Sequence, residues 1–267
     1  MIRRMIVAGV LMPVLMVAAS ANGAAVLFNV TWDDLAASSG ITPIAPAVSG
    51  QTATLPTGVR HVSGAFMYLV NNDADPGSGT VVPGKALRMQ DISTATSGWV
   101  EFRLHDDDVI DTGRVDISLD MLASSSEDHN ADWTRLLLMQ GTQNIGSLVL
   151  EPSDQSLSFV QYNPVNTVHS TVALTGTYPL GEIFKVGLRL DLDADTVEVF
   201  INGQSRGTAS LPSGAEFHAF RPDTGSSSNT NWHIIDNVLV AVPEPASLSM
   251  LGVGLVVLAR RRRGAMI

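Results

Sequence analysis

The sequence predicts an all-β protein folded as a two-sheet antiparallel sandwich. Between its two ends the chain consists of short segments in which apolar and polar residues alternate, broken by Gly, Pro, Asn, Asp and Ser. This period of two places one face of a strand in the core and the other face in water. No amphipathic helical pattern of about twelve residues or more occurs there. Residues 26–241 are enough for the single core of such a sandwich.

In the first half of this region, strands are expected where β-branched and aromatic residues gather. These segments are residues 26–32, 59–70 (one or two strands), 86–90, 99–104 and 113–121. Residues 41–57, rich in Pro, Ala and Thr, are expected to form an extended loop. The cluster N-N-D-A-D-P-G-S-G at residues 71–79 is expected to form a turn.

In the second half, the predicted strands follow one another closely. They are residues 135–139, 146–151, 157–162, 168–174, 183–192, 196–202, 206–211 and 232–242. Asn202-Gly203 is the strongest hairpin signal in the chain, because both turn positions favour positive φ. In total, roughly twelve to fourteen strands without helices indicate two packed antiparallel sheets.

Residues 184–211 form a strand, an acidic turn, a strand ending in F-I-N-G and a returning strand. This segment resembles the late hairpins of laminin-G and concanavalin A-like jelly-roll domains, and residues 234–240 (I-I-D-N-V-L-V) resemble their closing strand. The resemblance implies a jelly roll whose last strand runs back beside the first. Lectins, carbohydrate-binding modules, adhesion domains and glycoside hydrolases share that fold, so the fold does not choose a function.

The C-terminal residues 242–267 have three parts in a fixed order. Pro243, Glu244 and Pro245 form a stiff, extended tripeptide, because each proline restricts itself and the residue before it. An uncharged apolar segment follows at residues 246–259. A block of four arginines comes after it: Arg260, Arg261, Arg262 and Arg263. A recognised tripeptide, a membrane-entering helix and a cationic stop on the cytoplasmic side are the parts of a sorting signal.

These residues resemble the PEP-CTERM sorting signal of exported bacterial proteins. The resemblance implies that an exosortase embedded in the membrane recognises Pro243, Glu244 and Pro245, cuts near them and passes the protein to the surface or to extracellular polymer. A permanent transmembrane anchor is the alternative. The fourteen residues 246–259 rise about 1.5 Å each and span only about 21 Å, short of a hydrocarbon core about 30 Å thick.

The N-terminus predicts a second targeting segment, because Arg3 and Arg4 precede an apolar run at residues 5–19. Three regions are therefore expected: a signal peptide at 1–25, the sandwich at 26–241 and the sorting signal at 242–267. The expected partners are the secretion machinery and the exosortase. Before processing the termini hold the protein at the membrane, and afterwards it lies at the cell surface or in the extracellular matrix.

The middle of the chain is strongly acidic. Residues 26–241 hold ten Lys and Arg against twenty-five Asp and Glu, a net charge near −15. Nucleic acid and anionic lipid need cationic patches, so no nucleic acid is expected as a partner of this domain. The chain has no cysteine, which excludes disulfides, thiol catalysis and cysteine-bound metals.

Asp73 and Asp75 are the candidate metal ligands, because hard carboxylate oxygens at short spacing on a flexible loop suit calcium. Two other acidic groups are expected to be solvated turns, namely residues 106–108 and the set Asp191, Asp193 and Asp195. Three tryptophans near strand starts either present a flat face to a sugar ring or lie in the core: Trp99, Trp133 and Trp232. The six histidines show no ligand spacing, so no zinc site is expected.

No catalytic residue is predicted. Glycoside hydrolases of the resembled fold usually carry Glu-x-Asp-x-x-Glu on one strand, and the chain has no such spacing, no Gly-x-Ser-x-Gly elbow and no His-Glu-x-x-His pair. The main hypothesis is an exported, non-enzymatic surface or matrix protein associated with extracellular polysaccharide. The alternatives are a polysaccharide-active lyase or hydrolase with an unfamiliar constellation, and a purely structural envelope component.

Deleting Pro243, Glu244 and Pro245 removes the tripeptide and leaves the apolar segment and the arginines in place. The variant is expected to accumulate as a longer, membrane-retained species, because the processing enzyme no longer cuts it. Immunoblots of the membrane and released fractions measure both size and location. Unchanged mature size together with unchanged release would refute the sorting interpretation.

Overall fold

A computed structural model describes the chain at residues 25–30, 42–43, 59–60, 67–71, 78–90, 99–104, 109–123, 134–163, 167–224 and 232–243. These residues form strands joined by turns, and residues 25–243 make up one compact unit. Within the described part, no helix has the length and apolar character needed to cross a membrane. Residues 1–24 of the signal peptide expected at 1–25 and the apolar residues 246–259 lie outside the described residues, so the signal peptide stays a prediction.

Nine strands of the described residues form sheet A, in the order β14-β13-β12-β7-β16-β5-β4-β2, with β1 also paired to β16. Their bounds are β1 (Ala25–Val30), β2 (Thr42–Pro43), β4 (Met67–Asn71), β5 (Lys85–Gln90), β7 (Arg114–Ala123), β12 (Ile183–Asp191), β13 (Thr196–Ile201), β14 (Gln204–Ser210) and β16 (Trp232–Val242). β16 pairs with β7 on one side and with β5 and β1 on the other. The closing strand therefore runs beside the first, as the jelly-roll resemblance implies.

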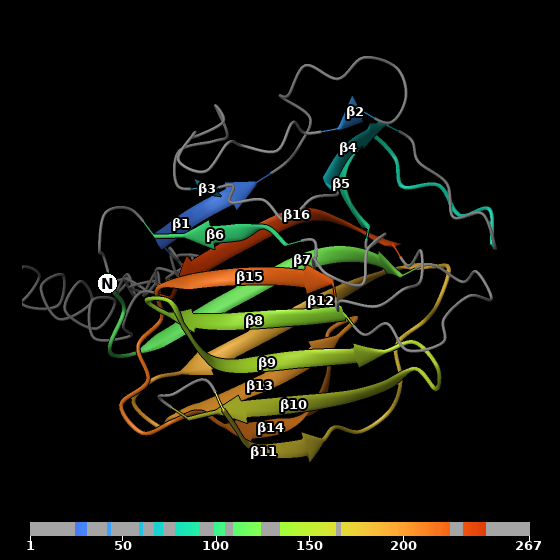
Figure 1. The fold of residues 1–267 in the computed structure, drawn as a ribbon. Helices are drawn as coiled ribbons and strands as arrows, with labels where there is room; N and C mark the ends of the chain where they lie inside the picture. Colours follow the sequence, from blue (N-terminus) through green and yellow to red (C-terminus); the bar gives the residue numbers. More distant parts are fainter. Residues whose placement is uncertain are drawn as a thin grey trace, which may run out of the picture. The chain divides into compact units, whose positions relative to one another are not determined.

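Seven strands of the described residues form sheet B, in the order β11-β10-β9-β8-β15-β6-β3. Their bounds are β3 (Val59–Arg60), β6 (Glu101–Arg103), β8 (Thr134–Gln140), β9 (Gln143–Glu151), β10 (Ser156–Tyr162), β11 (Val168–Ala173) and β15 (Ala219–Thr224). Every strand pair is antiparallel. Figure 1 shows β8, β9 and β10 layered over β7, β12 and β13. The predicted all-β, two-sheet jelly-roll sandwich is confirmed.

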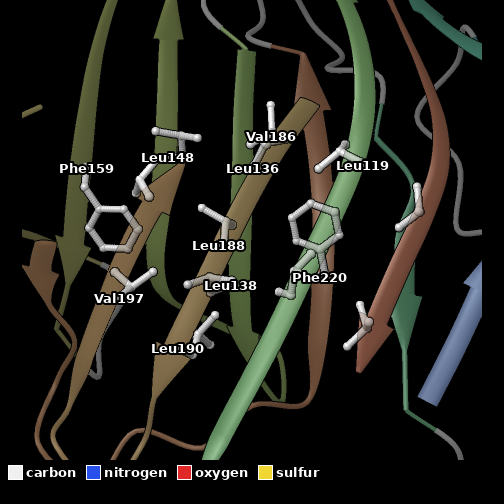
Figure 2. Close-up of a cluster of buried hydrophobic side chains, with 14 of the residues drawn as sticks. Leu119, Leu136, Leu138, Leu148, Phe159, Val186, Leu188, Leu190, Val197 and Phe220 are labelled. Atoms are coloured by element: carbon white, nitrogen blue, oxygen red, sulfur yellow. The ribbon is translucent and has the colours of Figure 1, made fainter. Parts of the chain in front are cut away.

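The core lies between the two sheets, where their inward-facing side chains meet (Figure 2). Sheet A contributes Leu119, Val186, Leu188, Leu190 and Val197, and sheet B contributes Leu136, Leu138, Leu148, Phe159 and Phe220. Each of these ten side chains is at most 1% exposed. Removal of such apolar surface from water, at about 25 cal/mol per Å², is the main force that holds the sheets together.

Local signals predicted several elements closely. The alternation at residues 113–121 becomes β7, whose side chains are alternately buried and half-buried. The Asn202-Gly203 hairpin signal is confirmed, since both residues have positive φ, 51° and 76°. The Asn202 side chain adds a hydrogen bond, because its Oδ1 accepts the Lys185 N–H at 2.8 Å.

One internal strand of sheet B, β15, was missed by sequence reasoning. Its Pro222 argues against a central strand, because proline cannot donate to a ladder. In the structure the Pro222 carbonyl accepts the Val100 N–H at 3.1 Å, so the missing donor faces the side of the short β6. The ladder with β8 therefore continues through Pro222 over all six residues of β15.

Two other segments differ from expectation. Thr42–Pro43 pairs briefly with β4, although residues 41–57 were expected to form a loop. Trp99 joins sheet B only through an isolated bridge to Asp223, so the strand expected at residues 99–104 shortens to Glu101–Arg103. With these changes the described residues hold sixteen strands, more than were expected.

Gly146 of β9 gives a test of this packing. A methyl group at Gly146 overlaps the ring of Phe159 and lies 3.3 Å from Leu211. Gly146→Ala is therefore expected to lower the free energy of unfolding by about 1–3 kcal/mol, as overpacked core sites do. Urea denaturation measures this loss. Gly187→Ala on β12 is the matched control, because its new methyl lies 3.4 Å from Phe200, and equal losses in the two variants would contradict the packing argument.

Candidate functional site

A cavity of about 120 Å³ opens on the outer face of sheet A, beside the segment at residues 78–84. It is lined by Val82, Pro83, Asp120, Met121, Leu122, Ile183, Ile234, Asp236 and Asn237, and we call it the Asp236 cavity. The Ser78 hydroxyl donates to the Gly181 carbonyl at 2.6 Å and holds one end of the segment. Val82 is buried against Ala86, Leu122 and Ile234, which fixes the apolar wall.

The backbone of β16 is irregular at this cavity. Its pairing with β7 shifts register between Asp236 and Leu239, and Asn237 has a φ of 50°. Among the described residues, the other non-glycine residues with positive φ lie in hairpin turns: Gln155, Asp195 and Asn202. Asn237 stands within a strand. A backbone of this kind costs about 1–3 kcal/mol and gathers at binding sites, where bulges redirect side chains.

Two carboxylates meet beside the bulge, because Asp120 of β7 lies directly opposite Asp236 of β16. Like charges in opposite positions destabilise a sheet. Donors offset this repulsion: Asn237 Nδ2 donates to Asp120 Oδ2 at 2.8 Å, and the Asn237 N–H donates to Asp236 Oδ1 at 2.7 Å. Lys185 Nζ lies 3.5 Å from Asp120 Oδ1. The site therefore presents ordered acceptors and one cation.

The chemistry of the Asp236 cavity suits a polar ring with an apolar face. The lining combines carboxylate and amide groups with the apolar side chains of Val82, Pro83 and Ile183, and Ile183 is 41% exposed. A sugar ring carries hydroxyl donors around its edge and C–H groups on its faces, which matches this lining. Sites for drug-sized ligands begin near 300 Å³, so the cavity has room for one small ring at most.

The remaining outer face of sheet A carries a ladder of paired charges. Arg189 of β12 lies between Asp116, at 3.6 Å, and Glu198, at 3.3 Å. The Ser205 hydroxyl donates to Glu198 at 2.7 Å, and the Arg189 guanidinium lies 4.7 Å from the centroid of Phe200. Exposed pairs of this kind contribute at most about 1 kcal/mol each. Glu198 is therefore part of a solvated ion-pair ladder.

A second cavity of about 120 Å³ lies between the β8–β9 turn and residues 212–214. It is lined by Gln140, Gln143, Asn144, Ile145, Asn163, Pro212, Ser213 and Gly214. Gln140 already exchanges two hydrogen bonds with Glu216, at 3.2 and 3.4 Å. The Asp236 cavity is the stronger candidate, because only there does an irregular strand backbone coincide with convergent carboxylates.

The residues predicted for sorting and for calcium lie mostly outside the described residues. Pro243 directly follows β16 and is half-buried. Glu244, Pro245 and Arg260 to Arg263 are not described, and neither are Asp73 and Asp75. The calcium site stays a prediction. In the part of the chain that the structure describes, no cluster of three or more His, Cys, Asp or Glu side chains could hold a metal ion.

Asp191, Asp193 and Asp195 act as turn residues. Their carboxylates accept backbone N–H groups from Ala194, Gly113 and Gly214, at 3.0, 3.1 and 3.0 Å respectively. Asp195 itself has a φ of 51°, which suits its place in the β12–β13 turn. These oxygens support the turns around the sandwich end. Residues 106–108 lie outside the described residues.

Trp99 is half-buried on the outer face of sheet B. The Arg221 guanidinium lies 4.4 Å from its ring centroid, so one face of the indole is occupied. Arg221 and Arg135 bind the buried carboxylate of Asp223 at 3.2 and 2.9 Å. Such a network orders the strands around β15. Trp133 and the side chain of Trp232 lie outside the described residues.

Sequence reasoning missed Asp120, Asp236 and Asn237 as a site. The available signal was the Asp236-Asn237 pair, two strong turn formers inside the otherwise apolar run I-I-D-N-V-L-V. Asp120 appeared only as one of the polar residues on the wet face of β7. Its partnership with Asn237 joins residues 117 positions apart in the chain.

Comparison with protein families identifies a known motif at the C-terminus. Residues 241–263 match the model of the PEP-CTERM protein-sorting motif. The chain carries a PEP-CTERM sorting signal. This confirms the resemblance drawn from Pro243, Glu244, Pro245 and the arginine block, and it marks an exported, cell-surface protein that an exosortase processes.

The folded region is distantly similar to several solved structures. A conserved carbohydrate esterase from Shiga toxin-encoding bacteriophage phi24B is 16% identical, with 77% of this chain and 100% of that chain covered and a TM-score of 0.49. A sialidase is 13% identical, with coverages of 67% and 17% and a TM-score of 0.49. The binding domain of botulinum neurotoxin serotype D is 10% identical, with coverages of 70% and 44% and a TM-score of 0.47.

The chain spans less than half the length of the sialidase and of the toxin domain. No curated protein matches the chain. At these identities and TM-scores, the likenesses transfer neither an activity nor a ligand to this chain.

His233, three residues before Asp236, is the buried histidine of sheet A. Its Nδ1 lies 3.2 Å from Thr134 Oγ1 of β8, so the two side chains bridge the sheets. Burial lowers the pKa of His233 from 6.5 to about 4. The native protein therefore keeps this imidazole neutral at a pH where the unfolded chain protonates it.

The free energy of unfolding is expected to fall as the pH drops from 6.5 towards 4, because only the unfolded chain takes up the His233 proton in that window. The shift corresponds to roughly 3 kcal/mol. Urea unfolding at a series of pH values measures the slope. His233→Gln is expected to flatten it, since carboxylate titrations are common to both proteins, and identical slopes would contradict the assignment.

Proposed function

We propose that the protein is an exported, non-enzymatic component of the cell surface or extracellular matrix, and that its sandwich binds extracellular polysaccharide. The observation that carries the proposal is the Asp236 cavity, where the irregular backbone at Asn237 brings two carboxylates and an amide against an apolar wall. Functional sites retain such costly backbone, because binding rather than stability maintains it. The sorting signal at residues 241–263 supports an extracellular ligand.

The charge of the cavity narrows the class of sugar. Asp120 and Asp236 line the cavity and no Lys or Arg belongs to its lining, so the lining is acidic. A neutral sugar or an amino sugar can donate hydrogen bonds to both carboxylates, whereas a uronic acid adds like charge. We therefore expect neutral or amino-sugar polymers as ligands.

The remaining parts of the proposal follow from the two ends of the chain. A signal peptide at residues 1–25 delivers the chain to the secretion machinery, the sandwich at 26–241 is the mature domain, and residues 242–267 are the sorting signal. Before processing, the termini associate with the membrane. Calcium at Asp73 and Asp75 is a proposed structural addition to the domain.

The second candidate is a polysaccharide-active hydrolase. One observation favours it: Asp120 and Asp236 are cross-strand partners, which places their Cβ atoms about 4.5–5.5 Å apart, and retaining glycosidases hold two carboxyl groups about 5 Å apart. The contacts of Asp120 argue against it. Its oxygens accept from Asn237 and pair with Lys185, whereas a general acid must donate a proton.

Asp236→Asn and Asp120→Asn in the mature exported protein test the binding site. Each is expected to weaken polysaccharide binding about tenfold or more, because a charge-assisted hydrogen bond to a sugar hydroxyl is replaced by a neutral one. A glycan array followed by titration calorimetry identifies the polymer and measures its dissociation constant. Asp116→Asn is the matched control on β7, since Asp116 belongs to the ion-pair ladder outside the cavity.

The outcomes separate the hypotheses. No binding to any polysaccharide, with or without calcium, leaves a structural role. Equal weakening by Asp116→Asn and Asp236→Asn moves binding away from the cavity. Release of reducing ends by the native protein that Asp120→Asn abolishes establishes the hydrolase instead.

A further inference from the structure

Five strands of the described residues pair on one side only, namely β1, β2, β3, β11 and β14, and three of them are protected. β2 and β3 are two residues long. In β14 the Arg206 carbonyl accepts both the N–H and the hydroxyl of Thr175 at 2.8 Å, and Gly207, with a φ of 138°, breaks the regular edge. Proteins commonly blunt edge strands by such shortness, covering or irregularity. β1 and β11 are six residues long and have no such protection in the described residues, and five of the six residues of β11 are exposed.

β11 uses only one of its two edges. Its residues Val168–Ala173 pair with β10, and within the described chain no hydrogen bond joins the opposite edge to another segment. The Leu174 N–H donates to the Leu157 carbonyl at 2.9 Å, so Val172 also faces β10. Because backbone groups alternate along a strand, Thr171 and Ala173 direct their N–H and C=O groups to the open side. Figure 1 shows β11 at the margin of its sheet.

The same strand is exposed, carries two valines and has no Asp, Glu, Lys or Arg. Val168 is 60% exposed and Val172 is 37% exposed. No Asp, Glu, Lys or Arg stands between Asp154 and Glu182, although the surrounding domain has a net charge near −15. Like charges keep two copies of an acidic domain apart, so they approach most easily where charge is absent.

We propose that β11 pairs antiparallel with β11 of a second copy about a two-fold axis near Thr171, so that two B sheets become one continuous sheet. A second copy fits because a two-fold axis matches an uncharged strand to an identical uncharged strand. Pairing gives the open Thr171 and Ala173 groups partners and covers the exposed valines. Sorting of many copies to one cell surface raises the local concentration of the protein, which favours pairing between neighbouring copies. This self-association is independent of any polysaccharide bound at the Asp236 cavity.

Thr171→Pro tests the pairing in the mature exported protein. Proline removes the N–H on the open side and is tolerated on an edge strand, so the hydrogen bonds to β10 remain. Its dimer dissociation constant is expected to rise about tenfold or more, measured by sedimentation across protein concentrations. Thr171→Val keeps every backbone donor and is expected to dimerise like the native protein. Ala173→Lys, on an exposed residue, is a second variant that weakens pairing by charge repulsion.

A cysteine experiment locates the contact. The chain has no cysteine, so Thr171→Cys introduces a single thiol. Hydrogen-bonded partners on antiparallel strands have Cα atoms about 5.5 Å apart, within the range of about 4.4–6.8 Å that a disulfide requires. Oxidation is therefore expected to give a covalent dimer. Thr208→Cys, an exposed threonine on the protected strand β14, is the matched control and is expected to form no covalent dimer on oxidation.

Three results overturn the proposal. One is a monomer at every concentration up to the solubility limit. Another is a dimer whose dissociation constant is unchanged by both Thr171→Pro and Ala173→Lys. The third is equal cross-linking of Thr171→Cys and Thr208→Cys, which shows random collision in place of strand pairing.

Discussion

The pairing of β16 on both of its edges is the constraint on which the rest of the structure depends. This strand bonds to β7 along one side and to β5 and β1 along the other, so it joins the first and last parts of the sandwich. Its own residues Ile235, Val238 and Val240 are completely buried. Neighbouring strands pair with both edges of β16, so the unfavourable backbone at Asn237 cannot relax. The same backbone in an edge strand would be free to relax. The pairing of β16 on both edges therefore holds the backbone of the Asp236 cavity in place.

The same strand links the folded domain to its sorting signal. The matched motif begins at Ala241, inside β16, and Pro243 follows the strand directly. No linker in the sequence separates the sheet from the tripeptide, so an exosortase must approach a segment that starts at the sandwich itself. The arginine block belongs to the motif, and residues 26–241 without it hold ten Lys and Arg against twenty-five Asp and Glu.

The charged residues of this acidic domain are distributed unevenly, so its surfaces differ in the partners that they suit. On the outer face of sheet A, Arg189 and Lys185 pair with the carboxylates of neighbouring strands, so most acidic groups there have a partner. The Asp236 cavity keeps an excess of acceptors, which suits a ligand rich in hydroxyl donors. The β10–β11 hairpin has no charge at all, which suits contact between copies. The proposed polysaccharide binding and the proposed self-association therefore use different strands and are compatible in one surface layer.

The sequence by itself determined the elements whose signals are local. Alternation specified β7, Asn202-Gly203 specified a hairpin turn, and the closing strand was predicted at residues 232–242, the bounds of β16. The order of tripeptide, apolar segment and arginines specified the sorting signal, because a processing enzyme meets those parts as linear chain. Such features depend on residues within one turn or one strand of each other.

Only the tertiary structure decided the features that depend on distant partners. Pro222 is tolerated inside β15 because its missing N–H faces the short β6, and nothing near it in the sequence reveals which neighbour that side has. Asp120 meets Asp236 because β7 and β16 are adjacent in sheet A. β11 is an open edge because no other strand of the described chain continues sheet B beyond it. Strand order is a property of the whole sheet, since each pairing is settled by the burial of the complete core.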